Sequence, residues 1–358
     1  NVLFTADPPE HTRHRRLLNG ALKRSAIEKF KNQISVINKD LITILPRNEV
    51  FNIIEYFTVP SPIRCLAKLL DVPAERDADF YRWASAINST IGTSMSSDKV
   101  KQVIEDQMDF WSFFENELKD RENRDADDLL TAIANSESTE EAPLKLSEKV
   151  GFCAQLVGAG ADTTSKLLDF SILALAQDPK LQIKLRSDKT LIAPFLEEIL
   201  RLEPPVQGMF RVTTEDITLE TFSIPRGAHL WLLYAAANRD ENAFVCPHQI
   251  NLDRPSSTDH LSFGSGPHVC IGANLARKVA ENAIWELLQQ TRAIVSVQDS
   301  SALNMQSSYI MHGFSEFSVV SIKFNKKTNK IKKIKTTENI KNIFLFNDNK
   351  KFNLTTQS

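Results

Sequence analysis

Residues 263–272 read Phe-Gly-Ser-Gly-Pro-His-Val-Cys-Ile-Gly, and this stretch carries the most information about the fold. Cys270 has one glycine four positions before it and another two positions after it, and a helical pattern over residues 271–288 follows at once. Glycines let the backbone pass close to a bulky flat group, because they carry no side chain. The helix start directs backbone amides at the sulfur, which favours the thiolate over the thiol. The stretch therefore predicts a thiolate that ligates a metal ion, with a small buried cysteine in a glycine turn as the alternative.

The same stretch resembles the cysteine-ligand loop of the cytochrome P450 superfamily. The pattern of that loop is Phe-x-x-Gly-x-x-x-Cys-x-Gly, and its four fixed positions are met by Phe263, Gly266, Cys270 and Gly272. The resemblance implies haem b, iron protoporphyrin IX, as the cofactor and Cys270 as the ligand of its iron. It also implies that Phe263, Gly264 and Gly272 belong to the cofactor site.

A second motif lies inside a long helical pattern, where residues 156–164 read Leu-Val-Gly-Ala-Gly-Ala-Asp-Thr-Thr. Each glycine inside a helix costs ~1 kcal/mol relative to alanine, so the two glycines require a reason. They leave room either for a flat ligand or for a closely packed helix, and the motif alone favours packing. The motif resembles the oxygen-activation groove of the same family. That resemblance implies that Ala159 and Gly160 contact the haem, and that Asp162 and Thr163 act in oxygen activation and proton delivery.

Glu198 and Arg201 lie three positions apart, on one face of a predicted helix. If the pair were exposed, it would contribute well under ~1 kcal/mol. The pair resembles the Glu-x-x-Arg helix of the family, in which both residues are buried and joined by an arginine from a later loop. Arg254 matches that arginine, and Ile250 replaces the second phenylalanine of the loop pattern as an apolar anchor. The resemblance implies that the three charged residues hold the cysteine loop in place and are not catalytic.

Haem carries two propionates, so its site needs cationic donors. The resemblance assigns this role to His11 and Arg15, which lie in a run that matches the third lettered helix of bacterial family members. It also assigns Arg211, which matches the arginine that starts a sheet strand in the family, and His268, two positions before Cys270. Any one of these side chains alone could equally be a solvated surface charge. Their common order and spacing favour the cofactor site.

The chain as a whole is expected to be mainly α with small β-sheets. Apolar residues at helical spacing between positions 104 and 118 give one face, for which we expect core packing. Strand patterns lie at residues 217–219 and 230–233, separated by a turn that contains Gly227. A terminal hairpin is expected over residues 307–323. The resemblance implies the cytochrome P450 fold.

The resemblance covers residues 1–323, a partial haem domain that begins at the third helix of the family. The first strands and helices of the fold are therefore expected to be missing, as in a fragment or a truncated gene. Residues 324–358 hold nine lysines against Glu338 and Asp348, a net charge of +7, whereas the whole chain carries −2. This composition predicts a disordered, solvated tail, with binding to an acidic surface or to nucleic acid as the alternative.

The bulk composition, with 42% hydrophobic and 25% charged residues, is typical of a soluble globular protein. Four cysteines without a Cys-x-x-Cys pair argue against a zinc site or a disulfide framework and favour a reducing, cytoplasmic compartment. No apolar run approaches the ~20 residues of a membrane span, and no signal peptide opens the sequence. We therefore expect a monomer without a membrane or nucleic-acid partner.

The function implied by the resemblance is that of a soluble, bacterial-type haem-thiolate monooxygenase, which inserts one atom of dioxygen into a small apolar substrate. The sequence has no flavin or nicotinamide fingerprint, so a ferredoxin or flavodoxin is the expected electron donor. Arg277 and Lys278 could receive such an acidic partner, or could simply form a solvated helix face. A non-catalytic haem-binding or partner-binding remnant is the alternative function. Peroxide-driven turnover is a third possibility, against which the acid and alcohol at Asp162 and Thr163 argue.

Overall fold

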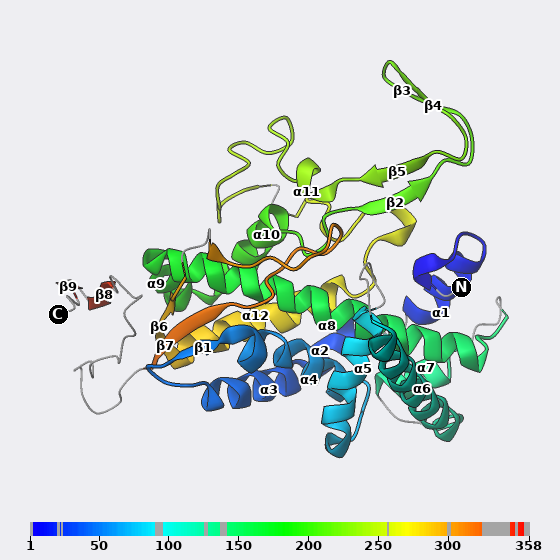
Figure 1. The fold of residues 1–358 in the computed structure, drawn as a ribbon, viewed down its shortest axis with the longest axis horizontal. Helices are drawn as coiled ribbons and strands as arrows, with labels where there is room; N and C mark the ends of the chain where they lie inside the picture. The colour runs from blue at the N-terminus through cyan, green and yellow to red at the C-terminus, as the bar shows by residue number, and fades with distance from the viewer. Residues whose placement is uncertain are drawn as a thin grey trace.

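The structure is a computed structural model that describes residues 3–19, 22, 24–89, 96–124, 128–136, 142–255, 258–298, 302–323, 344–347 and 350–353. These residues form a mainly helical body with small antiparallel sheets, so the predicted fold class is confirmed (Figure 1). The helices are η1 (Leu3–Thr5), α1 (Glu10–Asn19), α2 (Arg24–Lys29), α3 (Lys31–Ile44), η2 (Ile54–Thr58), α4 (Pro60–Leu69), η3 (Ala74–Arg76), α5 (Asp77–Ser89), α6 (Ser97–Asp120), α7 (Leu129–Ala134), α8 (Leu146–Gln177), α9 (Pro179–Ser187), η4 (Lys189–Leu191), α10 (Ile192–Leu202), α11 (Tyr234–Ala237), η5 (Gly266–His268) and α12 (Ala273–Gln290).

The strands form one sheet of three and three sheets of two. The three-stranded sheet has the order β1-β7-β6, and the pairs are β2 with β5, β3 with β4 and β8 with β9. All pairings are antiparallel. The strands are β1 (Val50–Asn52), β2 (Met209–Val212), β3 (Ile217–Leu219), β4 (Phe222–Ile224), β5 (His229–Leu232), β6 (Thr291–Ser296), β7 (Ser318–Lys323), β8 (Phe344–Asn347) and β9 (Lys350–Asn353).

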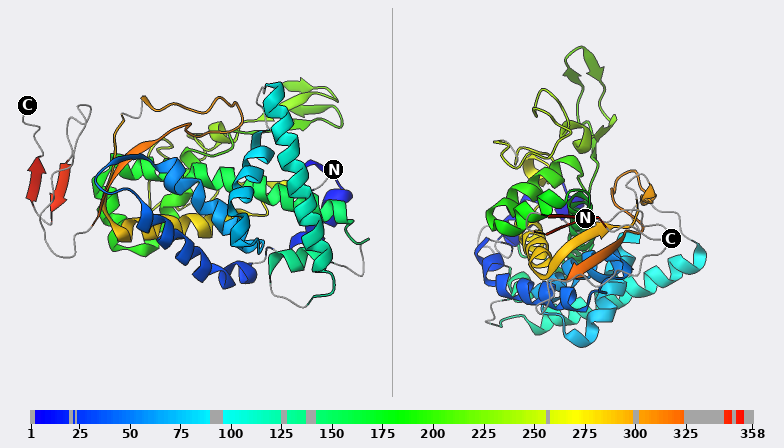
Figure 2. Two further views of the ribbon diagram at one scale, coloured as in Figure 1. Left: turned by 60° about the horizontal axis from the view of Figure 1, so that its bottom comes forward. Right: turned by 90° about the vertical axis from the view of Figure 1, so that its left-hand side faces the viewer.

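Helix α8 runs through the middle of the molecule, and α4, α5, α6, α9, α10 and α12 pack against it (Figures 1 and 2). Its N-terminal half belongs to one hydrophobic cluster, with Val157 among the buried residues, and its C-terminal half belongs to a second, with Leu168. Each fully buried side chain of this kind contributes roughly 1.5–3 kcal/mol. The two clusters fix α8 along its length. None of the described helices combines the length and the apolarity needed to cross a bilayer.

Local sequence explains where α8 and its neighbours end. The side chain of Asp178 accepts hydrogen bonds from the backbone N–H groups of Lys180 (2.9 Å) and Leu181 (3.1 Å), so it caps α9. Pro179 occupies the first turn of α9, where its missing N–H costs nothing. Pro204 follows the end of α10, because the residue before a proline avoids the helical conformation.

The sheets differ in part from the prediction. The expected strands at residues 217–219 and 230–233 are present as β3 and β5, and the turn before β5 contains Gly227 with φ of +81°. The expected terminal hairpin over residues 307–323 is wrong, because β7 pairs with β6 and β1 instead. Residues 302–317 instead form a loop, closed by an isolated bridge between Met305 and Phe314. Both partners of β7 lie outside the segment that was expected to form the hairpin.

The apolar face expected on α6 is only partly buried. Phe114 and Leu118 are fully buried, as predicted, whereas Ile104, Met108 and Trp111 are 51%, 67% and 40% exposed. Core packing was therefore the wrong prediction for these three residues. The sequence of α6 carries apolar residues on more than one face, so the periodicity alone does not show which face meets the body.

The predicted tail over residues 324–358 lies mostly outside the described residues. Within it the structure describes only strands β8 and β9, which pair with each other. The disordered tail and the boundary at residue 323 both stay predictions.

Candidate functional site

The loop before α12 presents Cys270 on the surface. The residue is exposed, and its backbone N–H donates to the carbonyl of Phe263 at 2.8 Å, which closes the loop. Gly264 and Gly266 have φ of +70° and +73°, in the left-handed region that favours glycine. A Cβ on Gly266 would meet nothing within 4 Å, so this glycine serves the turn itself. The loop geometry thus fixes the direction of the thiol.

The start of α12 acts on the sulfur in the predicted direction. The protein around the thiol raises the pKa of Cys270 through desolvation. Backbone N–H groups of Gly272 and Ala273 and the charges of Arg15 and Arg277 oppose that rise. The pKa remains raised overall, so the helix start alone does not produce a thiolate. Coordination to a metal ion would deprotonate the thiol outright.

Two of the predicted anion-binding residues are in ring contact beside this loop. The centroids of His11 and His268 lie 4.0 Å apart, and His11 is buried. Burial lowers the pKa of both histidines. The charge of His268 lowers the pKa of His11 further, and the charge of Arg211 does the same for His268. Asp7 partly offsets the positive charge around both rings.

The two predicted arginines complete this cationic group. Arg15 donates from Nη1 to the carbonyl of Val269 at 2.7 Å, directly before Cys270. Arg211 lies on β2 and donates to the carbonyl of Phe210 at 2.7 Å. Both arginines lower the pKa of His268, so the structure brings all the predicted propionate partners together. We call His11, Arg15, Arg211 and His268 the cationic cluster. Two permanent positive charges beside two histidines, whose protonation an anion would favour, are suited to an anionic ligand.

The glycines of the α8 motif have a packing role. A Cβ on Gly158 would lie 2.6 Å from Cγ2 of Ile87 in α5. A Cβ on Gly160 would lie 3.0 Å from Cδ1 of Leu66 in α4. Both glycines therefore allow neighbouring helices to approach, which is the alternative that the sequence left open. A contact of Gly160 with the cofactor stays a prediction.

The other predicted residues of this motif, Ala159, Asp162 and Thr163, lie on a side of α8 that is not fully covered by neighbouring elements. We call it the open side of α8. Ala159 is exposed although it lies in the middle of a central helix, and Asp162 and Thr163 are half-buried. The hydroxyl of Thr163 donates to the carbonyl of Ala159 at 2.5 Å, one turn back, as predicted. Asp162 forms an ion pair with Lys166. Lys166 was not singled out from the sequence, although an acid and a lysine four positions apart on a helix signal such a pair.

The cysteine loop and α8 are joined by one hydrophobic cluster. Ile271, next to Cys270, packs against a cluster that includes Leu156 and Val157 of α8 and Leu275 of α12. The exposed thiol and the open side of α8 thus belong to neighbouring elements held by a common core. This arrangement can bind a metal through one sulfur and an anion through the cationic cluster.

The predicted structural group on α10 is brought together in the core. Glu198 and Arg201 are 0% exposed and Arg254 is 7% exposed. The carboxylate of Glu198 accepts from Nε of Arg201 and from Nε of Arg254, both at 2.8 Å. The N–H of Asn251 donates to the same carboxylate at 2.8 Å. Each charge in this group therefore has a close partner, as buried charges require.

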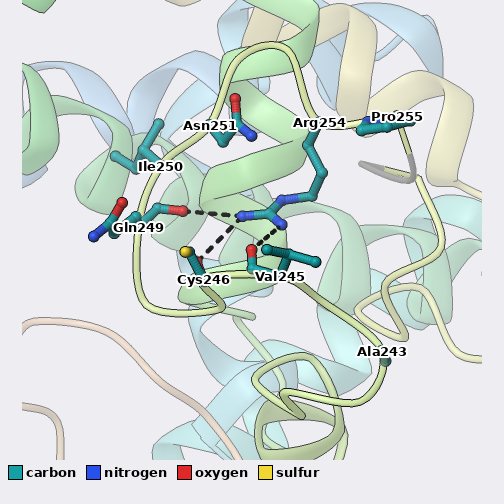
Figure 3. A pocket seen from close by; sticks show the side chains of 8 residues that line it. All are labelled: Ala243, Val245, Cys246, Gln249, Ile250, Asn251, Arg254 and Pro255. Atoms are coloured by element: carbon teal, nitrogen blue, oxygen red, sulfur yellow. Dashed lines mark hydrogen bonds between the residues drawn. The ribbon is translucent and has the colours of Figure 1, made fainter.

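Figure 3 shows how Arg254 holds its loop. The guanidinium donates to the backbone carbonyls of Val245, Cys246 and Gln249. These residues line a shallow pocket of about 440 Å³, and Arg254 is the one charged residue among the lining residues that the structure describes. Ile250 lines the same pocket and is 36% exposed, so it does not anchor the loop in the core as expected. Among these described lining residues, the thiol of Cys246 is the one reactive group.

Arg277 has a different role from the one considered for it. Its guanidinium donates to both oxygens of Glu197, at 2.7 and 2.9 Å, and lies 4.4 Å from the centroid of the Phe263 ring. His260 contacts Glu197 as well, at 3.1 Å. Lys278 lies near Glu28 and Glu281. The sequence did not single out Glu197 or His260, because nothing distinguishes them from other polar residues until Phe263 is placed beside them.

A second charged cluster joins α1 to the start of α8. Carboxylates of Glu10 and Glu148 lie with His14 in a group that could hold a metal ion. Arg13, however, donates to both carboxylates, so the protein already supplies the cation. Burial raises the pKa of Glu148, but the N–H of Lys145, His14 and Arg13 lower it to about 2. This cluster is an ion-pair network that braces two helices.

The comparisons with known proteins identify the family. The family profile "Cytochrome P450" matches residues 1–313. "Cytochrome P450 109" from Bacillus spizizenii is 33% identical over 297 residues, which cover 82% of this chain and 72% of the relative.

Solved structures of cytochromes P450 are also similar to this chain. The structure of a Bacillus megaterium cytochrome P450 in complex with corticosterone has a TM-score of 0.82 and 28% identity, and the match covers 89% of this chain and 85% of that one. A structure of P450BioI in complex with an acyl carrier protein that is ligated to hexadec-9Z-enoic acid has a TM-score of 0.80 and 28% identity, and the match covers 89% of this chain and 81% of that one.

Proposed function

The chain belongs to the cytochrome P450 family, whose members are haem monooxygenases, and on that premise we propose that it oxidises a small apolar organic substrate with electrons from a separate redox protein. The observation that carries the proposal is the cationic cluster beside the exposed thiol of Cys270. Two arginines supply positive charge beside the thiol, and two histidines can add hydrogen bonds or charge when an anion favours their protonation, so the group matches a metal-bearing dianion.

The residues of the site fit haem b. Cys270 would ligate the iron, and His11, Arg15, Arg211 and His268 would bind the two propionates. When bound, haem supplies the activation of dioxygen, with the thiolate favouring cleavage of the O–O bond. The protein supplies position, protons and exclusion of water.

Asp162 and Thr163 are proposed to handle protons on the open side of α8. The hydroxyl of Thr163 has a free lone pair for a further donor while it donates to the carbonyl of Ala159. The carboxylate of Asp162 can accept a proton from a solvent hydronium ion and pass it to a water molecule that donates to that hydroxyl. Both residues are half-buried, so they lie between the core and the open side.

The substrate class is proposed from the ligands named for similar proteins. One solved relative holds corticosterone and another holds a hexadecenoyl chain, both largely apolar. We propose a ligand of this chemistry for this chain. For the electron donor we propose a ferredoxin- or flavodoxin-type protein, in the cytoplasm.

The central test is the spectrum of the reduced protein with carbon monoxide. Thiolate ligation should give the far-red-shifted Soret band of the family, and Cys270→Ala should abolish it. Cys246→Ala is the matched control, because Cys246 is the other exposed cysteine. A thiolate-type band that persists in Cys270→Ala would show that the ligand is misassigned.

The substrate class is tested by spectral titration of the oxidised protein with corticosterone and with hexadec-9-enoic acid. A saturable shift of the Soret band with either ligand supports the class, and turnover then requires a ferredoxin with its reductase.

For Thr163→Ala we expect haem binding to persist while electrons are diverted to hydrogen peroxide. Unchanged product per electron in Thr163→Ala would remove its proposed role.

A further inference from the structure

A buried lysine on α8 remains without a role in the proposed reaction. Lys166 is 2% exposed and is followed by the buried residues Leu167 and Leu168. A buried ammonium is costly unless a charged partner compensates it. Its Nζ donates to Oδ1 of Asp162, one helical turn back. Because the side chain of Asp162 is 29% exposed, the pair connects the core with the open side of α8.

The stem of this lysine is guided by the loop over residues 302–317. A Cβ placed on Gly313 would lie 2.6 Å from Cγ, 3.0 Å from Cδ and 2.9 Å from Cε of Lys166. The loop backbone therefore runs against the stem along most of its length. The loop is itself fixed, since the N–H of Gln306 donates to the carbonyl of Gly313 at 2.8 Å. The lysine thus has little freedom to point elsewhere.

A second acid lies one turn further along the same face of α8. Asp169 is buried, and Thr58 donates to its Oδ1. Burial raises the pKa of Asp169 to about 7, and the Thr58 hydroxyl and the Lys166 charge oppose that rise. Asp169 is thus partly neutral near pH 7. Its hydrogen-bond partner, Thr58, belongs to η2. The ammonium of Lys166 is bonded to Asp162 and not to Asp169.

We propose that Lys166 is a positioning residue for the reaction proposed above, on which this inference rests: its ammonium holds the carboxylate of Asp162 beside Thr163. The ion pair engages Oδ1 and leaves Oδ2 free to accept a proton from a solvent hydronium ion. Oδ2 then passes this proton to a water molecule on the open side of α8, which restores the carboxylate, while Oδ1 stays paired with the ammonium throughout. Without the ammonium, the Asp162 side chain is free to turn to other rotamers.

The pair itself is tested by a double-mutant cycle on the haem-loaded protein. Asp162→Asn, Lys166→Met and the double variant are unfolded in urea. Each single change should lower the folding equilibrium constant on the order of 10- to 100-fold, as expected for a hydrogen bond to a charged group. The double variant should lose far less than the product of the two single losses. If the losses simply multiply, the two side chains do not interact and the inference fails.

The positioning role is tested by product formed per electron consumed, with corticosterone or hexadec-9-enoic acid as the probe. Lys166→Met should lower this ratio roughly ten-fold, in the range typical of residues that orient reactive groups. Lys166→Gln keeps a hydrogen-bond donor and should recover part of the loss. Asp169→Asn is the matched control on the same face, because an amide oxygen can still accept from Thr58, and it should leave the ratio unchanged.

A second variant keeps the test decisive if Lys166→Met does not fold. Gly313→Ala retains both charges but displaces the stem of Lys166, and it should lower the product ratio in the same direction. The positioning role would be overturned by one result. In that result the double-mutant cycle shows that Asp162 and Lys166 interact, but a folded Lys166 variant still forms the normal amount of product per electron. Absence of the thiolate spectrum would instead refute the proposed function, while the urea cycle would still decide whether the pair exists.

Discussion

The buried charges around Glu198 and the cationic cluster beside Cys270 show two opposite uses of arginine. In the first region, Arg201 and Arg254 share one carboxylate at 2.8 Å and donate their remaining N–H groups to backbone carbonyls. In the second, Arg15 and Arg211 bond only to carbonyls among the residues that the structure describes. The protein completes the first region by itself, and the second has positive charge left for a ligand.

Removing the shared carboxylate should have the largest effect on stability. Glu198→Gln leaves two buried guanidinium groups without their counter-charge, which costs roughly 3–5 kcal/mol of unfolding free energy. The control is Glu203→Gln, since Glu203 is 32% exposed and pairs with a partly exposed Arg239. That change should cost below ~1 kcal/mol. Equal losses in urea unfolding would show that burial does not distinguish the two pairs.

Removing a cation from the cationic cluster should affect the cofactor more than the fold. Arg211→Ala should raise the rate of haem loss to an acceptor protein roughly 10- to 100-fold, as for other hydrogen bonds to charged groups. The unfolding free energy of the haem-free protein should stay nearly unchanged, because the change also relieves repulsion with His268. If the variant loses unfolding free energy but keeps its haem, Arg211 is a structural residue like Arg201 and Arg254.

The histidines of the cluster predict a pH dependence. Burial and nearby positive charge hold the folded-state pKa of His11 and His268 below 6.5, so the unfolded state binds more protons in acid. The haem-free protein should therefore lose stability as pH falls below about 6.5. Haem should weaken this dependence, because its propionates favour the protonated rings. Equal slopes in urea unfolding between pH 7 and 5, with and without haem, would contradict the assignment.

The smallest effect is expected for the lysine-rich residues after position 324. Their positive charge is expected to be solvated, and ordering them costs ~1–2 kcal/mol per residue with little apolar surface to bury. A chain that ends near Phe324 should keep its melting temperature and its haem content. A clear drop in melting temperature would show that this segment packs on the body.

The sequence predicted which residues of the candidate site lie together better than it predicted how the surrounding elements pack. The resemblance to the family named the Cys270 loop, the cationic cluster and the Glu198 group, and the structure places the members of each group close together, while their roles stay predictions. Long-range packing could not be derived in the same way. The periodicity of α6 did not reveal that Trp111 faces outward, and nothing local to β7 identified β6 as its partner.

The same limit applies to buried polar partners. Lys166 and Glu197 each have a clear role only when a distant element is placed beside them, Gly313 in one case and Arg277 in the other. A pattern within one helix shows which side chains can meet, but the cost of burial that makes a pair matter is set by the tertiary structure.

The contact between Gly158 and Ile87 has a consequence for protein engineering. A methyl group at position 158 would lie 2.6 Å from the branched side chain at position 87, so neither position can be enlarged by itself. A library that varies residue 158 alone should return mostly glycine. Gly158→Ala should be recovered together with a shorter residue at position 87, such as Ile87→Ala. The two positions are therefore best randomised as a pair. Their joint choice gives a way to change the packing of α5 against α8 without altering Asp162 or Thr163.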